Sequence, residues 1–130
     1  MKRVLVVEDD LNTLRGLEVL LRNDGYAVRG VMRGRQAQAL VAREHFDVVL
    51  CDYKLPDIDG LQVCLALREL RPHLALFLLT AYSSAEITRG AKECGIERIF
   101  HKPLDLDELF KALFSVSAPS AEITRACAVP

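Results

Sequence analysis

The chain has 130 residues, of which 51% are hydrophobic, and it carries 17 Lys and Arg against 18 Asp and Glu. This length allows one sizeable hydrophobic core but hardly two, so we expect a single domain. The net charge of −1, with both signs interspersed, argues against binding to nucleic acid or to an anionic membrane. No apolar stretch is long enough to span a bilayer, and the four cysteines lack metal-site spacing, so we expect a soluble protein of the reducing cytoplasm.

Short apolar runs alternate along the chain with segments of helical periodicity. The runs lie at residues 3–7, 26–31, 47–51, 75–79 and 98–101. The run at 26–31 is weaker and typical of an edge strand, whereas the others lack polar alternation and predict parallel strands covered on both faces. Five helices are predicted from apolar spacing at Leu14, Leu17 and Leu21; Ala37, Leu40 and Val41; Leu61, Cys64 and Leu65; Ile87, Ala91 and Cys94; and Leu106, Leu109, Phe110 and Leu113.

Start and stop residues agree with these helices. Asp10 is a candidate N-cap, and two pairs have capping-box spacing: Ser83 with Glu86, and Asp105 with Glu108. Gly25 and Gly95 stand just past helix ends, and Asp59 is a candidate cap of the third helix, whereas Asp57 is expected to serve only as a turn residue. We expect Phe77, Phe100, Phe110 and Phe114 in the core.

The resulting order is five strand–helix units. Right-handed crossovers turn such a chain into an open, doubly wound parallel sheet with helices on both faces. In such folds, ligands bind at the carboxyl ends of the strands. We therefore expect the polar residues that follow the strands to form the functional site.

Five polar residues occupy these strand ends: Glu8, Asp9, Asp52, Thr80 and Lys102. Two like charges 4 Å apart repel by roughly 4 kcal/mol at an effective dielectric near 20, so the three carboxylates need a cation. Carboxylate oxygens with room for water suit Mg²⁺, and Lys102 adds a fixed positive charge. With Asp52 as nucleophile and a hydroxyl donor at Thr80, this set predicts a magnesium-dependent phosphoryl acceptor.

The same residues resemble, in order and position, the receiver domain of bacterial response regulators. The motifs that carry the resemblance are Glu8-Asp9, Asp52 ahead of Leu55-Pro56-Asp57-Ile58-Asp59-Gly60, Thr80-Ala81 and Lys102-Pro103. The resemblance implies a flavodoxin-like α/β fold, (βα)5, with strand order 2-1-3-4-5. It also implies that Asp52 accepts a phosphoryl group from a phosphohistidine on a histidine kinase or phosphotransfer protein.

The resemblance further implies how the site is completed and how it signals. Glu8, Asp9 and Asp52 would hold Mg²⁺ together with the backbone carbonyl of Lys54, and Lys102 would precede a cis proline. Signalling to a downstream effector would use the face of the fourth helix, fifth strand and fifth helix, about residues 83–114. The protein would catalyse only its own phosphoryl transfer and dephosphorylation, and dimerisation through the fourth-helix face is left open.

Three other functions are alternatives to this one. A phosphatase with an aspartyl nucleophile usually has a second aspartate two positions later, where this chain has Lys54. A flavin carrier of the same fold needs a phosphate-binding loop after the first strand, where Glu8-Asp9-Asp10 would repel the phosphate. An unphosphorylated, receiver-like scaffold or interaction module stays open, because receivers commonly have an aromatic residue where this chain has Ile99.

Two further features of the sequence bear on the lifetime of the phosphoryl group and on the end of the domain. Lys54 and Tyr82 occupy positions that in receivers influence attack of water on the phosphoryl group, and we hypothesise that their large side chains lengthen its lifetime. We expect residues 1–116 to form the receiver domain and 117–130 a flexible tail or linker stub. Within that tail, residues 120–125 repeat residues 84–89, an identity for which chance or a short duplication is the favoured explanation.

Overall fold

A computed structural model describes residues 1–116 of the chain. Its five strands are β1 (Arg3–Val7), β2 (Ala27–Val31), β3 (Val48–Asp52), β4 (Ala75–Thr80) and β5 (Arg98–His101). Its five helices are α1 (Leu11–Asn23), α2 (Gly34–Arg43), α3 (Gly60–Leu70), α4 (Ala85–Cys94) and α5 (Leu106–Ser115). Strands and helices alternate strictly, as the sequence predicts. The expected tail, residues 117–130, lies outside the described residues.

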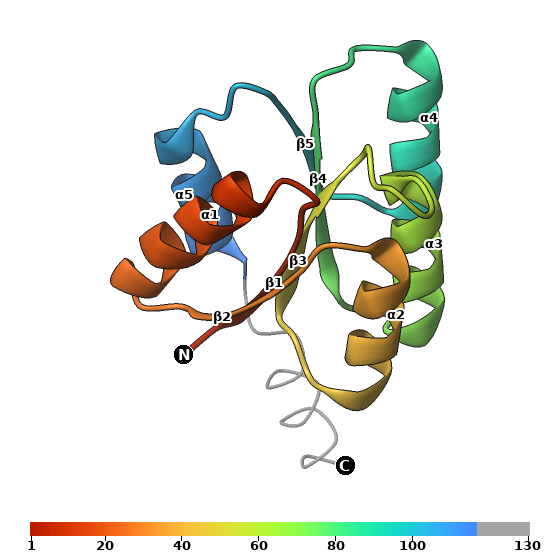
Figure 1. Cartoon of the computed structure of the whole chain (residues 1–130). Coiled ribbons are helices and arrows are strands. Elements are labelled where there is room, and N and C mark those ends of the chain that lie inside the picture. The colour runs from red at the N-terminus through yellow and green to blue at the C-terminus, as the bar shows by residue number, and fades with distance from the viewer. Residues whose placement is uncertain (117–130) are drawn as a thin grey trace.

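The strands form one parallel sheet in the order β2-β1-β3-β4-β5. Helices α1 and α5 cover one face, and α2, α3 and α4 cover the other (Figure 1). The flavodoxin-like fold and its strand order are therefore confirmed. Edge strand β2 lies where the weaker apolar run predicts it. The opposite edge strand, β5, is more exposed than its run suggests, because only Phe100 of its four residues is buried.

Two hydrophobic layers flank the sheet because successive strand residues point to opposite faces. Val6, Leu50 and Phe77 pack toward α1 and α5, whereas Val7 and Cys51 pack toward α2 and α3. The three cysteines in the described part, at 51, 64 and 94, are buried and free, as small hydrophobic residues would be. Within residues 1–116, none of the helices is both long and apolar enough to cross a bilayer.

The helix caps were predicted correctly at three positions and wrongly at one. Asp10, Asp59 and Asp105 each accept a hydrogen bond from the backbone N–H three residues later, and Asp59 forms a full capping box with Gln62. The cap of α4 is Ser84, not Ser83, because Ser84 adopts the extended backbone of an N-cap and its Oγ accepts from Ile87 N–H at 3.1 Å.

Phe114 was wrongly expected in the core, since 83% of it is exposed. The buried stripe of α5 consists of Leu109, Ala112 and Leu113, and the next residue is turned about a quarter of the helix circumference away from that stripe. Phe77 and Phe100 are buried as expected, with ring centroids 5.5 Å apart.

Arg68 ties the far end of α4 to the rest of the fold. Its guanidinium donates to four main-chain carbonyls, those of Cys94 (3.0 Å), Gly95 (2.9 Å), Pro72 (2.8 Å) and Leu74 (2.7 Å). These carbonyls belong to the end of α4 and to the segment that leads into β4. One side chain on α3 therefore fixes the positions of two neighbouring elements.

Candidate functional site

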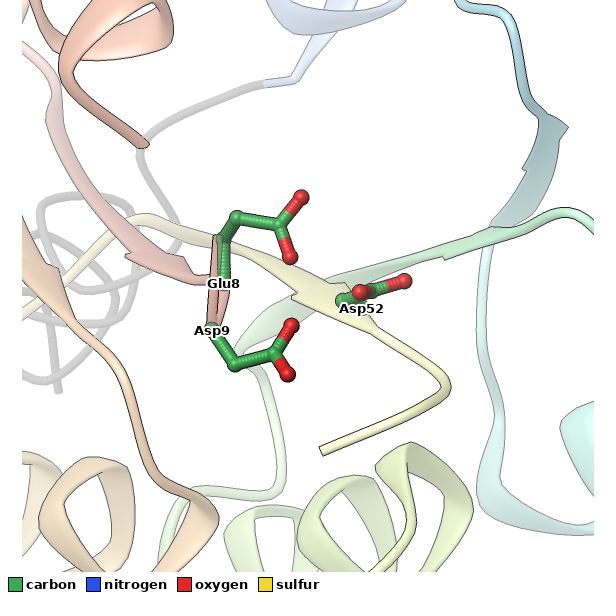
Figure 2. A group of neighbouring side chains, drawn as sticks. All are labelled: Glu8, Asp9 and Asp52. Atoms are coloured by element: carbon green, nitrogen blue, oxygen red, sulfur yellow. The ribbon is translucent and has the colours of Figure 1, made fainter. Parts of the chain in front are cut away.

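The site begins where β1 and β3 end. The parallel register pairs Val7 with Cys51, so the next residues along the two strands, Glu8 and Asp52, become neighbours. One carboxylate oxygen from each of Glu8, Asp9 and Asp52 lies within 4.8 Å of the other two. Figure 2 shows the three side chains projecting from the ends of these strands. Glu8 and Asp52 are buried, whereas Asp9 is exposed.

Lys102 brings a positive charge to this cluster from the end of an edge strand. It follows β5, and its Nζ lies 3.1 Å from Glu8 Oε1 and 3.2 Å from Asp52 Oδ2. The peptide bond between Lys102 and Pro103 is cis, as the resemblance implies. One ammonium therefore faces three carboxylates, and the cluster retains an excess of negative charge.

The titration behaviour of the cluster reflects this crowding. Burial and the neighbouring Asp52 carboxyl raise the pKa of Glu8 above its ordinary value, although Lys102 opposes the shift. Burial alone would lower the pKa of Lys102, but its hydrogen bond to Glu8 and the charge of Asp52 raise it. Lys102 is therefore held in its charged form by the acids around it.

Glu8 also carries an unsatisfied atom. Its Oε2 is buried and has no hydrogen-bond partner within residues 1–116, while Oε1 accepts from Lys102. A buried, unpartnered carboxylate oxygen is costly unless a donor or a metal ion satisfies it. The donor set consists of hard carboxylate oxygens, which are the ligands that Mg²⁺ prefers. The residues present thus fit a magnesium ion.

Thr80 completes the polar wall of the site at the end of β4. It is buried, and its Oγ1 accepts a hydrogen bond from Tyr82 N–H at 3.0 Å. The hydroxyl hydrogen makes no hydrogen bond to the described residues, so it is free to donate toward the site. A hollow of about 300 Å³ is lined by Asp9, Asp52, Lys54, Thr80, Ala81, Tyr82 and Lys102.

Two tyrosines stand together beside the hollow. The rings of Tyr53 and Tyr82 meet edge to face, with centroids 6.3 Å apart. Tyr53 comes from the segment after β3 and Tyr82 from the segment after β4. The contact links the two segments that directly follow Asp52 and Thr80. Tyr53 is not among the residues that the sequence predicts for the site.

Five of the six residues that the sequence predicts for the site lie together in the structure. Glu8, Asp9, Asp52 and Lys102 form the charged cluster, and Thr80 lines the same hollow. Lys54 lies at the edge of that hollow with an exposed side chain.

A comparison with known families agrees with this geometry. The model of the response regulator receiver domain matches residues 4–114 of the chain. The chain belongs to this family. It is thus a receiver domain of two-component response regulators, and receiver domains are phosphoryl-accepting signalling domains.

Relatives of this receiver include both long regulators and single-domain proteins. It is 39% identical over 106 residues to the transcriptional regulatory protein ZraR of Escherichia coli K12, a match covering 82% of this chain and 24% of ZraR. It is 29% identical over 112 residues to sporulation initiation phosphotransferase F of Bacillus subtilis, covering 86% and 90%. The chain thus spans about a quarter of the length of such transcriptional regulators.

Solved structures show the same fold. A CheY-like receiver domain protein from Methanospirillum hungatei superposes with a TM-score of 0.85 at 28% identity, covering 87% of this chain and 90% of that one. The response regulator TrrA of Thermotoga maritima, in complex with Mg²⁺ and BeF, gives a TM-score of 0.82 at 28% identity, with coverages of 90% and 100%.

Proposed function

We propose that this receiver accepts a phosphoryl group on Asp52 in a magnesium-dependent reaction. The observation that carries the proposal is the meeting of Asp52 with Lys102, at 3.2 Å, inside a cluster of three carboxylates. A lysine alone would make this an ordinary ion pair. The unpartnered Glu8 Oε2, which suits a magnesium ion, and the free hydroxyl hydrogen of Thr80 support more than that, namely a site at which Asp52 accepts a phosphoryl group.

In the proposed reaction, a carboxylate oxygen of Asp52 forms a bond to phosphorus while the bond from phosphorus to the donor histidine nitrogen breaks. The histidine leaves as imidazole after taking up a proton. Charge on the equatorial phosphoryl oxygens is stabilised by the ammonium of Lys102 and the hydroxyl of Thr80. Thr80 lies on the strand next to that of Asp52, and Lys102 Nζ already lies 3.2 Å from Asp52 Oδ2, so both groups need little rearrangement to meet those oxygens.

Glu8, Asp9, Asp52 and the backbone carbonyl of Lys54 are the proposed magnesium ligands. The ion would supply positive charge to the phosphoryl oxygens in addition to that of Lys102. Asp9 is exposed and Glu8 is buried, so the cluster opens toward solvent and leaves room for the water ligands that Mg²⁺ usually keeps.

The phosphoryl group would switch the surface by changing charge. It adds about −1.5 to −2 charge, which draws Thr80 and Lys102 inward and shifts the segment before α4. A downstream effector would recognise the face of α4, β5 and α5. Ile99, half-buried in β5, replaces the usual aromatic residue, so the inward movement of a ring is not part of this switch.

The remaining expectations complete the proposal. The phosphoryl donor is a histidine kinase or phosphotransfer protein, the location is cytoplasmic, and the domain boundary falls at residue 116. The receiver catalyses its own phosphorylation and dephosphorylation without acting on a separate substrate.

The proposal is tested by measuring the intact mass after incubation with phosphoramidate. We expect a gain of one phosphoryl group that requires Mg²⁺ and is absent in Asp52→Asn. Asp47→Asn, which removes a carboxylate at the opposite end of β3, serves as a matched control and should still be phosphorylated. No gain in the unmodified protein under any condition would contradict the proposal and favour the scaffold alternative.

A further inference from the structure

The segment between β3 and α3, residues 53–59, provides the capping hydrogen bonds for α2, a helix that lies earlier in the chain. Helix α2 begins at Gly34, and Arg33 at its N-cap position provides no side-chain hydrogen bond. Instead, Asp57 Oδ1 accepts from Gly34 N–H and Asp57 Oδ2 accepts from Arg35 N–H, both at 2.9 Å. Both oxygens of Asp57 are thereby occupied, and Asp57 is not a member of the acidic cluster. The first turn of α2 is capped by a residue 22 to 23 positions later in the chain.

Close packing holds the same segment against α2. A Cβ added at Gly34 would lie 2.8 Å from Ile58 Cγ1 and 2.5 Å from Val63 Cγ2. Only a glycine allows the helix start to approach Ile58 this closely. Two hydrogen bonds to Asp57 and close packing against Ile58 thus hold the start of α2 against this segment.

In the early part of the segment, backbone hydrogen bonds within residues 1–116 are made only at Tyr53. Tyr53 N–H donates to Leu79 O at 2.8 Å, and Gly60 N–H donates to Tyr53 O at 2.7 Å. Among the described residues, no hydrogen bond involves the backbone of Lys54. The position of the Lys54 carbonyl therefore depends on the anchors on either side of it. Tyr53 precedes it, and after it come the packing of Leu55 and Ile58 against the core and the hydrogen bonds of Asp57 to α2.

We propose that Asp57 is a positioning residue for the metal, holding the segment that carries the Lys54 carbonyl by capping α2. This inference rests on the proposed function, in which that carbonyl is a magnesium ligand. A residue that orients a ligand typically changes metal affinity by about tenfold or more when it is removed. Asp57 acts by accepting hydrogen bonds from two backbone N–H groups. Its contribution to Mg²⁺ affinity therefore depends on its two carboxylate oxygens as acceptors and not on its negative charge alone.

The test compares the Mg²⁺ dissociation constants of the unmodified protein, Asp57→Ala and Asp57→Asn by isothermal titration calorimetry. We expect about tenfold weaker binding for Asp57→Ala and a smaller loss for Asp57→Asn, which keeps one carbonyl acceptor. Asp105→Ala is the matched control, because it also removes one acidic helix cap, at α5, and should keep the unmodified affinity. Repeating the titrations at high KCl screens long-range charge effects, so a loss caused by positioning should persist.

Amide hydrogen exchange without metal provides a second readout. In Asp57→Ala and Asp57→Asn, exchange should accelerate at Gly34 and Arg35 and also at Gly60, whose N–H donates to Tyr53 O across the segment that carries Lys54. A cap acting only on α2 would not affect exchange at Gly60. Unchanged Mg²⁺ affinity in the Asp57 variants, or a loss that disappears at high salt, would overturn this inference alone. Absence of Mg²⁺ binding by the unmodified protein would overturn the proposed function and this inference with it.

Discussion

Replacing Lys102 by Met should destabilise the metal-free protein and tighten its binding of Mg²⁺. The ammonium lies 3.1 Å from Glu8 Oε1 and 3.2 Å from Asp52 Oδ2, and its charge offsets the repulsion between these two carboxylates. At an effective dielectric of 20, unit charges 4 Å apart interact by about 4 kcal/mol. Desolvation offsets part of this, and the Lys102 side chain is 29% exposed, so we expect a net loss of about 2 kcal/mol.

The effect on Mg²⁺ has the opposite sign. Unit charges 4 Å apart interact by about 1 kcal/mol in water, so a doubly charged ion held by the carboxylates that Lys102 contacts would be repelled by its ammonium by roughly 1–2 kcal/mol. Removing the ammonium should therefore raise Mg²⁺ affinity by about tenfold. Saturating Mg²⁺ should also restore much of the stability lost in Lys102→Met.

Urea unfolding monitored by circular dichroism, with and without Mg²⁺, measures both effects. Lys92→Met is the matched control, because Lys92 is an exposed lysine on α4 and its loss should change stability by less than about 0.5 kcal/mol. If Lys102→Met is as stable as the unmodified protein without metal, or if Mg²⁺ stabilises both equally, the electrostatic account of the cluster is wrong.

Three further predictions concern stability and the lifetime of the signal. Arg68→Met should lower the free energy of unfolding by about 2–4 kcal/mol, because it leaves partly buried carbonyls unpaired. Arg71→Met is the control and should lower it by less than about 1 kcal/mol, since Arg71 makes an exposed hydrogen bond. Equal losses for the two variants in urea unfolding would refute this. Tyr82→Ala should shorten the half-life of the phosphorylated protein, measured by intact mass, while Tyr82→Phe preserves it; an unchanged half-life in Tyr82→Ala would remove the shielding hypothesis. Burial opposes ionisation of Asp57, but hydrogen bonds from Arg35 and Gly34 N–H hold its pKa at about 2, so its contribution to stability should persist above pH 3.8 and vanish as the pH falls through about 2. Urea unfolding of the unmodified protein and Asp57→Ala across that range measures the contribution, and a difference that is lost near neutral pH would contradict it.

Much of the fold could be predicted because its signals are local. Runs such as Val4–Val7 are buried on both faces, so they lack polar alternation, and caps such as Asp59 bind a backbone N–H only three residues away. The α4 cap was misplaced by one residue because Ser83 and Ser84 are both good caps, and Glu86 favours the wrong one by its spacing. Only the backbone conformation distinguishes them.

The site was predictable to the extent that topology determines it. Once the strand order is known, Glu8, Asp52 and Lys102 must meet at one edge of the sheet, and they do so within hydrogen-bonding distance. Asp57 was interpreted as a turn residue because its partner, the start of α2, is distant in sequence. The missing cap at Arg33 was the available signal, and it becomes informative only when α2 lies beside residues 57 and 58.

The central claim is that Asp52 carries the phosphoryl group. After reaction with phosphoramidate and Mg²⁺, borohydride reduces an aspartyl phosphate to homoserine, which has one oxygen fewer and two hydrogens more than aspartate. Tryptic peptide 44–54 contains Asp47 and Asp52, and fragment masses distinguish the two positions. We predict homoserine at position 52 only when Mg²⁺ was present during phosphorylation; homoserine at another aspartate, with position 52 unchanged, would contradict the account.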